Sequence, residues 1–196
     1  LLVTMEEYEL AVKHLTKAVN LTTNYSETHN NLGNAFFKMK KFEKAISSYI
    51  RAIEINPDFT AGYNNLGVVL SQYKPKRYSE NLANSYLTIL NVGTAVRPMD
   101  IVGPIVELLK HNDLFKKLIT IANQADFTES SHEYLNQLSE IPLFLKVIEQ
   151  CPVPDLDIEN LLTKLRKFFL THKLIASAEN LFILQISIAL HCFTNE

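Results

Sequence analysis

The first half of the chain places apolar and polar residues at the spacing of amphipathic helices. In two neighbouring stretches, 26–40 and 42–55, apolar residues recur at intervals of three and four, which puts them on one helix face. The apolar residues of the two clearest stretches are Leu32, Ala35, Phe36 and Met39, then Phe42, Ala45, Ile46, Tyr49, Ala52 and Ile53.

The sequence Asn-Pro-Asp at positions 56–58 marks the end of the stretch 42–55. Proline cannot continue a helix, and it disfavours the helical conformation in the residue before it. The short polar side chain of Asp58 or Thr60 is then expected to cap the helix that follows.

The helical stretches repeat with a fixed period. The tetrapeptide Asn-Asn-Leu-Gly begins at Asn30 and again at Asn64, 34 residues later. A period of about 20 to 50 residues is typical of stacked structural repeats. Other pairs share the same separation: Tyr8, Ala11, Leu15 and Ala18 with Phe42, Ala45, Tyr49 and Ala52, and Tyr25 with Phe59.

Small residues occur where two helices of one repeat would meet. Gly33 lies inside a predicted helix, where glycine costs about 1 kcal/mol in helix propensity. Because it lacks a side chain, we expect it to let the second helix approach closely, with Ala45 and Ala52 as small partners on that helix. The full pattern resembles the tetratricopeptide repeat (TPR) at Leu32, Gly33, Phe36, Ala45, Tyr49, Ala52 and Pro57.

This resemblance implies an all-α fold, a right-handed α-solenoid of antiparallel helix pairs followed by an irregular helical region. We expect residues 1–98 to hold the TPR array, as a half repeat, one full repeat and one degenerate repeat. The resemblance implies that residues 4–24 form the second helix of the half repeat and that residues 59–73 form the first helix of the degenerate repeat. The degenerate repeat departs from the family because the stretch 74–77 delays the next aromatic, Tyr78, by two residues. The usual alanine is also replaced by Ser79 or delayed to Ala83, so we expect distorted packing of the helix 78–92.

Asparagines recur along the first helix of each repeat. In such arrays this helix lines a concave wall, and the string NNLGN is similar to the asparagine ladder of O-linked N-acetylglucosamine transferases. A side-chain amide both donates and accepts hydrogen bonds, so it can pair with a peptide backbone of any sequence. The resemblance places Glu27, Asn30, Asn34, Phe37 and Lys38, then Ala61, Asn64, Val68, Ser71 and Gln72, on the wall, with Asn31 and Asn65 beside it. The predicted peptide-binding residues are Asn30, Asn31, Asn34, Lys38, Asn64, Asn65 and Gln72.

This polar face has two other interpretations. The asparagines can instead solvate an exposed surface or tie neighbouring helices together, and this alternative stays open. Repeats of co-chaperones that grip a terminal carboxylate have lysine and arginine on the wall. Here Asn30 and Asn64 occupy the matching positions and Lys38 is nearly alone, so charge-assisted bonds to a carboxylate are not expected.

The region 99–196 loses the period but keeps a helical pattern. We expect helices over 99–111, 112–125, 128–140, 141–150, 156–172 and 175–195, and a chain that is cut short within a helical stack. Strand signals are absent from the sequence. Pro104 is expected in an early helical turn, where its missing N–H does no harm, and Pro142 is expected to play the same part in the helix 141–150. Asp155 or Asp157 is expected to cap the helix after the turn 151–154.

The last third carries a second resemblance. The sequences IPLFLKVIEQCPVPDLDIENLLTKLRKFFL and ALHCFTNE are similar to the region that joins repeats to the catalytic domain in some bacterial S-adenosylmethionine-dependent methyltransferases. This implies an alternative function, a substrate-docking and linker region whose catalytic domain lies outside this chain. The matching positions carry no assigned role; they are Glu159, Leu162, Thr163, Leu165, Arg166, Cys192, Phe193, Asn195 and Glu196.

Composition narrows the class of partner. The formal net charge is −2 and no long basic run occurs, so nucleic acid is not an expected partner. Cys151 and Cys192 lack CxxC spacing, which favours a reducing cytoplasm over a disulfide scaffold or zinc site. The apolar run 181–193 is shorter than the roughly 20 residues that span a bilayer, so a buried helix is expected there and no membrane partner.

The sequence offers little catalytic chemistry. Its five glycines form no phosphate-binding loop, so no cofactor is expected. Cys192 follows His191 on an apolar helix, where a buried thiol is more common than a nucleophile. We therefore expect a non-catalytic scaffold for a peptide or protein. Self-association through exposed helical ends is a further expectation, involving Leu10, Leu15 and Val19 of the incomplete first repeat.

Overall fold

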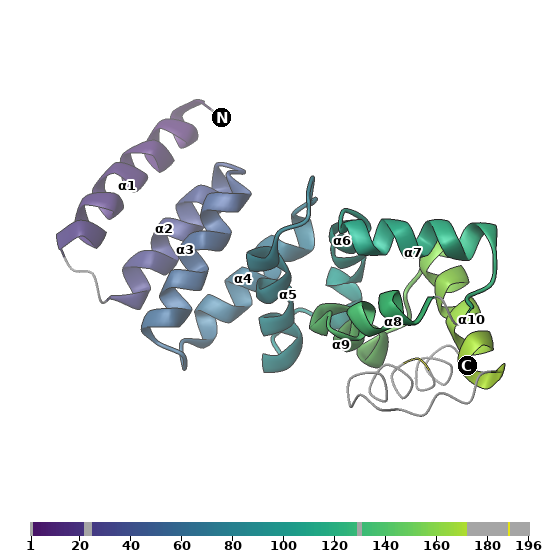
Figure 1. Ribbon diagram of the computed structural model, residues 1–196. Helices are drawn as coiled ribbons and strands as arrows, with labels where there is room; N and C mark the ends of the chain where they lie inside the picture. Colours follow the sequence, from purple (N-terminus) through teal and green to yellow (C-terminus); the bar gives the residue numbers. More distant parts are fainter. Residues whose placement is uncertain (1, 22–24, 129–130, 172–187, 189–196) are drawn as a thin grey trace. The chain divides into compact units, whose positions relative to one another are not determined.

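A computed structural model describes residues 2–21, 25–128, 131–171 and 188, and the regular structure in these ranges consists of helices, with no strand (Figure 1). The all-α prediction is therefore confirmed for the described residues. The helices are α1 (Leu2–Leu21), α2 (Ser26–Lys38), α3 (Phe42–Ile55), α4 (Thr60–Gln72), α5 (Glu80–Val92), α6 (Pro98–Lys110), α7 (Asp113–Gln124), α8 (His132–Ser139), α9 (Pro142–Gln150) and α10 (Leu156–Thr171).

The helix boundaries follow the sequence pattern closely. Helices α1 to α7, α9 and α10 each begin and end within three residues of their predicted bounds, and α8 begins four residues later than predicted. The helix predicted over 175–195 lies outside the described residues, apart from residue 188, which is helical and buried. No helix in the described part is long and apolar enough to cross a membrane.

The chain divides into two compact units, which are described separately. Unit 1 consists of Leu1–Tyr73 and Asn91–Arg97, and unit 2 consists of Lys74–Leu90 and Pro98–Glu196. The predicted division into a half, a full and a degenerate repeat stays a prediction.

In unit 1, consecutive helices pack on one another in chain order, α1 on α2, α2 on α3 and α3 on α4 (Figure 1). The predicted role of Gly33 is confirmed, because a Cβ added there would lie 2.5 Å from Cε1 of Tyr49 on α3. Ala45 and Ala52 on α3 are fully buried. Small residues on α3 and a glycine on α2 thus let the two backbones approach, and burial of the apolar stripe stabilises the pair.

Two turns of unit 1 show how its helices end and begin. After α2, Lys40 adopts a left-handed conformation with φ of 56°, and its N–H donates to the carbonyl of Phe37. Before α4, the N-cap position is occupied by Phe59, which makes no side-chain capping bond. The predicted cap by Asp58 or Thr60 is therefore wrong: the hydroxyl of Thr60 lies 3.5 Å from the carbonyl oxygen of Asp58 instead.

Unit 2 has an apolar core shared by several helices. The rings of Phe115 on α7 and Phe144 on α9 meet edge to face, with centroids 5.0 Å apart. Pro142 occupies the start of α9 as predicted. Pro104 lies inside α6, which begins at Pro98, so it is past the first turn, where a missing N–H does no harm.

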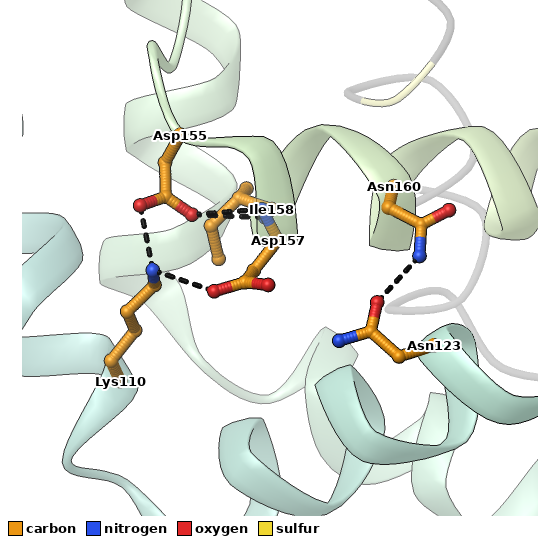
Figure 2. Close-up of polar contacts among 6 residues, drawn as sticks. All are labelled: Lys110, Asn123, Asp155, Asp157, Ile158 and Asn160. Carbon is orange, nitrogen blue, oxygen red and sulfur yellow. Dashed lines mark hydrogen bonds and ion pairs between the residues drawn. The ribbon is translucent and has the colours of Figure 1, made fainter.

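A polar cluster joins α6, α7 and α10 at the edge of this core (Figure 2). Lys110 Nζ at the end of α6 donates to Asp155 Oδ2 at 2.6 Å and to Asp157 Oδ2 at 2.9 Å. Asn160 on α10 donates to Asn123 Oδ1 on α7 at 2.7 Å. Asp155 Oδ1 also accepts from the backbone N–H groups of Asp157 and Ile158, which confirms it as the cap of α10.

Candidate functional site

The candidate site lies on α2 and α4, which contact each other within unit 1. Asn30 of α2 is buried, and its Oδ1 accepts a hydrogen bond from Nδ2 of Asn65 on α4 at 2.8 Å. This bond joins the first helices of two successive repeats. The interpretation in which asparagines tie neighbouring helices together is therefore confirmed for this pair.

Asn34 lies one helical turn after Asn30, on the same face of α2. Its Oδ1 accepts from the hydroxyl of Tyr49 at 2.8 Å. The ring of Tyr49 is buried against Gly33, and this burial raises the pKa of its hydroxyl to about 12. The hydroxyl keeps its proton at neutral pH and donates it to the Asn34 oxygen.

Asn64 forms a hydrogen bond with the turn after α5, a segment outside the repeat pattern. Its Oδ1 accepts from the backbone N–H of Ala95 at 3.1 Å, in the turn that follows α5. Gly93 begins this turn in a left-handed conformation with φ of +65°. Val96 then covers Gly67 on α4, since a Cβ at Gly67 would lie 3.0 Å from Cγ2 of Val96.

We call Asn30, Asn34 and Asn64 the asparagine row. Asn31, Lys38 and Gln72 are exposed, while Asn34, Asn64 and Asn65 are half-buried. Four of the predicted residues form hydrogen bonds within unit 1: Asn30 with Asn65, Asn34 with Tyr49 and Asn64 with Ala95. Within the described residues, no side-chain hydrogen bond is seen for Asn31, Lys38 or Gln72.

The remaining predicted positions on these helices are a mixture of apolar and polar side chains. Phe37 packs against Phe42, with ring centroids 6.0 Å apart. Val68 on α4 is 39% exposed, although its position in the repeat matches that of Asn34. The face is therefore polar on α2 and partly apolar on α4, and Lys38 is the basic residue among the ten predicted wall positions.

Candidate chemistry elsewhere in the described residues is sparse. Cys151 in unit 2 is buried, and burial raises the pKa of its thiol to about 11, so the reactive thiolate is disfavoured. No group of three potential metal ligands occurs within the ranges that the structure describes. The predicted inert pair His191 and Cys192 lies outside those ranges.

Comparison with known proteins bears on the N-terminal part. No curated protein matches the chain. The resemblance of the last third to a methyltransferase linker therefore has no support from these comparisons. A family model described as "Tetratricopeptide repeat" matches residues 26–59, and one described as "TPR repeat" matches residues 1–40. Repeats of this family generally mediate protein–protein interaction. Residues 1–59 are thus similar in sequence to tetratricopeptide repeats, and the stacked helices α1 to α4 agree with this similarity.

Proposed function

We propose that this chain is a protein-interaction module that binds an extended segment of a protein partner along α2 and α4. The proposed contact residues are those predicted from the repeat pattern: Asn30, Asn31, Asn34, Lys38, Asn64, Asn65 and Gln72. The observation that carries the proposal is the fixed orientation of Asn34 and Asn64. Each is half-buried and anchored through its Oδ1, at 2.8 Å and 3.1 Å respectively.

Anchoring matters because a mobile side chain loses conformational freedom when it binds. Immobilising a flexible side chain at an interface costs about 0.5–1.5 kcal/mol, and prior fixation reduces this cost. Two amides fixed on adjoining helices can therefore hold a backbone that runs across both helices. The nearly neutral surroundings favour an uncharged segment over an acidic terminus, because Lys38 alone supplies positive charge on the predicted wall.

The proposal is tested by selecting binders from a displayed library of random peptides against the full chain. The selected peptides are then titrated against a variant carrying Asn34→Ala and Asn64→Ala. We expect its affinity to fall by about tenfold, since each lost hydrogen bond is worth about 0.5–1.5 kcal/mol. A matched variant, Asn20→Ala with Asn91→Ala, changes two exposed asparagines of unit 1 outside α2 and α4 and should bind as the wild type does.

Circular dichroism of both variants establishes that the helices are retained. Equal binding by the wild type and the Asn34→Ala, Asn64→Ala variant, with helicity intact, would exclude these side chains from the binding surface. Failure to select any peptide would count against the interaction with extended segments itself.

A further inference from the structure

The asparagine row shares one chemical feature that the repeat pattern does not contain. In all three residues the side-chain oxygen is already engaged within the chain. Oδ1 of Asn30 accepts from Asn65 Nδ2, Oδ1 of Asn34 accepts from the Tyr49 hydroxyl, and Oδ1 of Asn64 accepts from the Ala95 N–H. The three donors come from a neighbouring helix, from the paired helix and from a turn.

The Nδ2 groups of the row are in the opposite situation. None of them makes a hydrogen bond within the described part of the chain. None is among the buried polar atoms that lack a partner, which in that part are the Oε1 of Gln150 and the Nε of Arg166. The side chains of Asn34 and Asn64 are half-buried, so water reaches part of each, and a ligand atom can replace that water.

The orientation at Asn64 is fixed by chemistry, because a backbone N–H can only donate. Ala95 therefore requires the oxygen of Asn64 to face it, and the amide nitrogen faces the other way. The same polarity holds at Asn30 and Asn34, through the bonds from Asn65 and Tyr49. An amide whose oxygen is engaged offers a ligand up to two N–H donors and has its best acceptor direction already occupied.

We propose that the asparagine row recognises the carbonyl oxygens of its partner's backbone and does not need the partner's N–H groups. This inference rests on the proposed function, and it narrows the class of partner. Segments that contain proline qualify, since proline keeps its carbonyl and lacks an N–H. Extended proline-containing segments also leave their backbone carbonyls free of internal hydrogen bonds, so these carbonyls are available to the row.

Substitution by aspartate separates the donor role from the structural role. Asparagine and aspartate have the same shape, and a carboxylate oxygen still accepts from the Tyr49 hydroxyl and from the Ala95 N–H. What is lost is the Nδ2 donor, which is replaced by a second oxygen that repels a carbonyl. Asn34→Asp with Asn64→Asp should therefore fold normally and bind the selected peptides at least about tenfold more weakly, because two hydrogen bonds are removed.

The matched control is Asn20→Asp with Asn91→Asp, which adds the same charge on exposed positions outside α2 and α4. It should bind within about twofold of the wild type, as expected when no hydrogen bond is lost. Thermal unfolding of both variants shows that the internal acceptors are retained. Binding by the Asn34→Asp, Asn64→Asp variant at wild-type strength would overturn the inference.

The complementary change is made in the peptide. In a selected peptide, each backbone N–H is replaced in turn by an ester oxygen, which removes one donor without adding bulk. We expect every replacement to weaken binding by less than about threefold, whereas deleting an N–H that the row recognised would cost about tenfold. A single ester that abolishes binding would contradict recognition through carbonyls. Affinity that is unaffected by Asn34→Ala and Asn64→Ala would instead refute the proposed function, so the two failures are distinguishable.

Discussion

The hydroxyl of Tyr49 on α3 donates to Oδ1 of Asn34 on α2 at 2.8 Å, while the Tyr49 ring covers Gly33, the residue next to Asn34. The Tyr49 side chain thus packs α3 against α2 and also orients the side-chain amide of Asn34. Packing of the repeat and presentation of the proposed binding residue are therefore coupled through Tyr49.

Removing only the hydroxyl tests this coupling. In Tyr49→Phe the ring still fills the space over Gly33, but Asn34 loses its donor. We expect unfolding free energy to fall by about 0.5–1.5 kcal/mol, the net value of one hydrogen bond. Affinity for a selected peptide should also fall, because the Asn34 amide is no longer fixed. Chemical denaturation and peptide titration measure the two effects.

The control is Tyr25→Phe, which removes an exposed hydroxyl that bonds Glu27 at 2.8 Å. It should leave both stability and binding near their wild-type values. If Tyr49→Phe lost stability with peptide affinity unchanged, the ring and hydroxyl would serve packing alone.

A pair of glycines permits a sharp test of close packing. In Gly33→Ala the new methyl would lie 2.5 Å from a carbon of the Tyr49 ring, so the ring or the two helices must shift. Overpacking of this kind costs about 1–3 kcal/mol, and the better helix propensity of alanine recovers about 1 kcal/mol of it at most. We expect a lower melting temperature, measured by calorimetry.

Gly103 on α6 supplies the opposite case, because nothing lies within 4 Å of a Cβ placed there. Gly103→Ala should therefore raise stability by up to about 1 kcal/mol, since alanine favours the helix. Similar responses of the two variants would show that contact with Tyr49 does not explain the glycine at position 33.

The success of the sequence-based predictions depended on how local each feature is. The fit of Gly33 against Tyr49 was predicted because both residues belong to one repeat, in which a glycine and small or aromatic residues recur with a fixed spacing. Helix boundaries were likewise predicted within a few residues, because proline and polar residues interrupt the apolar stripe.

The features that were missed depend on tertiary contacts. The donor to Asn64 is the backbone N–H of Ala95, 31 residues away in a turn outside the period. A backbone group carries no side-chain signature, so no residue pattern could indicate it; the glycine at position 93 signals only a turn.

The cap of α10 offers a test in unit 2. Asp155 both caps the helix and pairs with Lys110, and Asp155→Ala removes both interactions. We expect a loss of about 1–2 kcal/mol, dominated by the cap. Asp155→Asn keeps an oxygen for the backbone N–H groups, and Lys110 retains Asp157, so its loss should be clearly smaller.

Chemical denaturation of Asp155→Ala and Asp155→Asn separates the contribution of the helix cap from that of the ion pair with Lys110. Asp126→Ala is the control, because Asp126 pairs with Lys164 and Lys167 at the surface and is exposed. We expect no measurable change for it. Equal losses for Asp155→Ala and Asp155→Asn would assign the contribution to the charge and not to the cap.

His29 on α2 links the stability of unit 1 to pH. The residue is 8% exposed, and burial, with a smaller contribution from the positive charge of Arg51, lowers its pKa below the ordinary 6.5. The folded state therefore disfavours the imidazolium, and the unfolded chain binds more protons between the two pKa values. The stability contributed by neutral His29 is fully present above pH 6.5 and is lost as the pH falls through 6.5 towards the folded pKa.

Melting temperatures of the wild type and His29→Gln, measured between neutral and mildly acidic pH, should converge as the pH falls, because glutamine does not titrate. His14→Gln changes an exposed histidine on α1 and should stay parallel to the wild type throughout. A constant difference between the wild type and His29→Gln would rule out His29 as the group that senses acid.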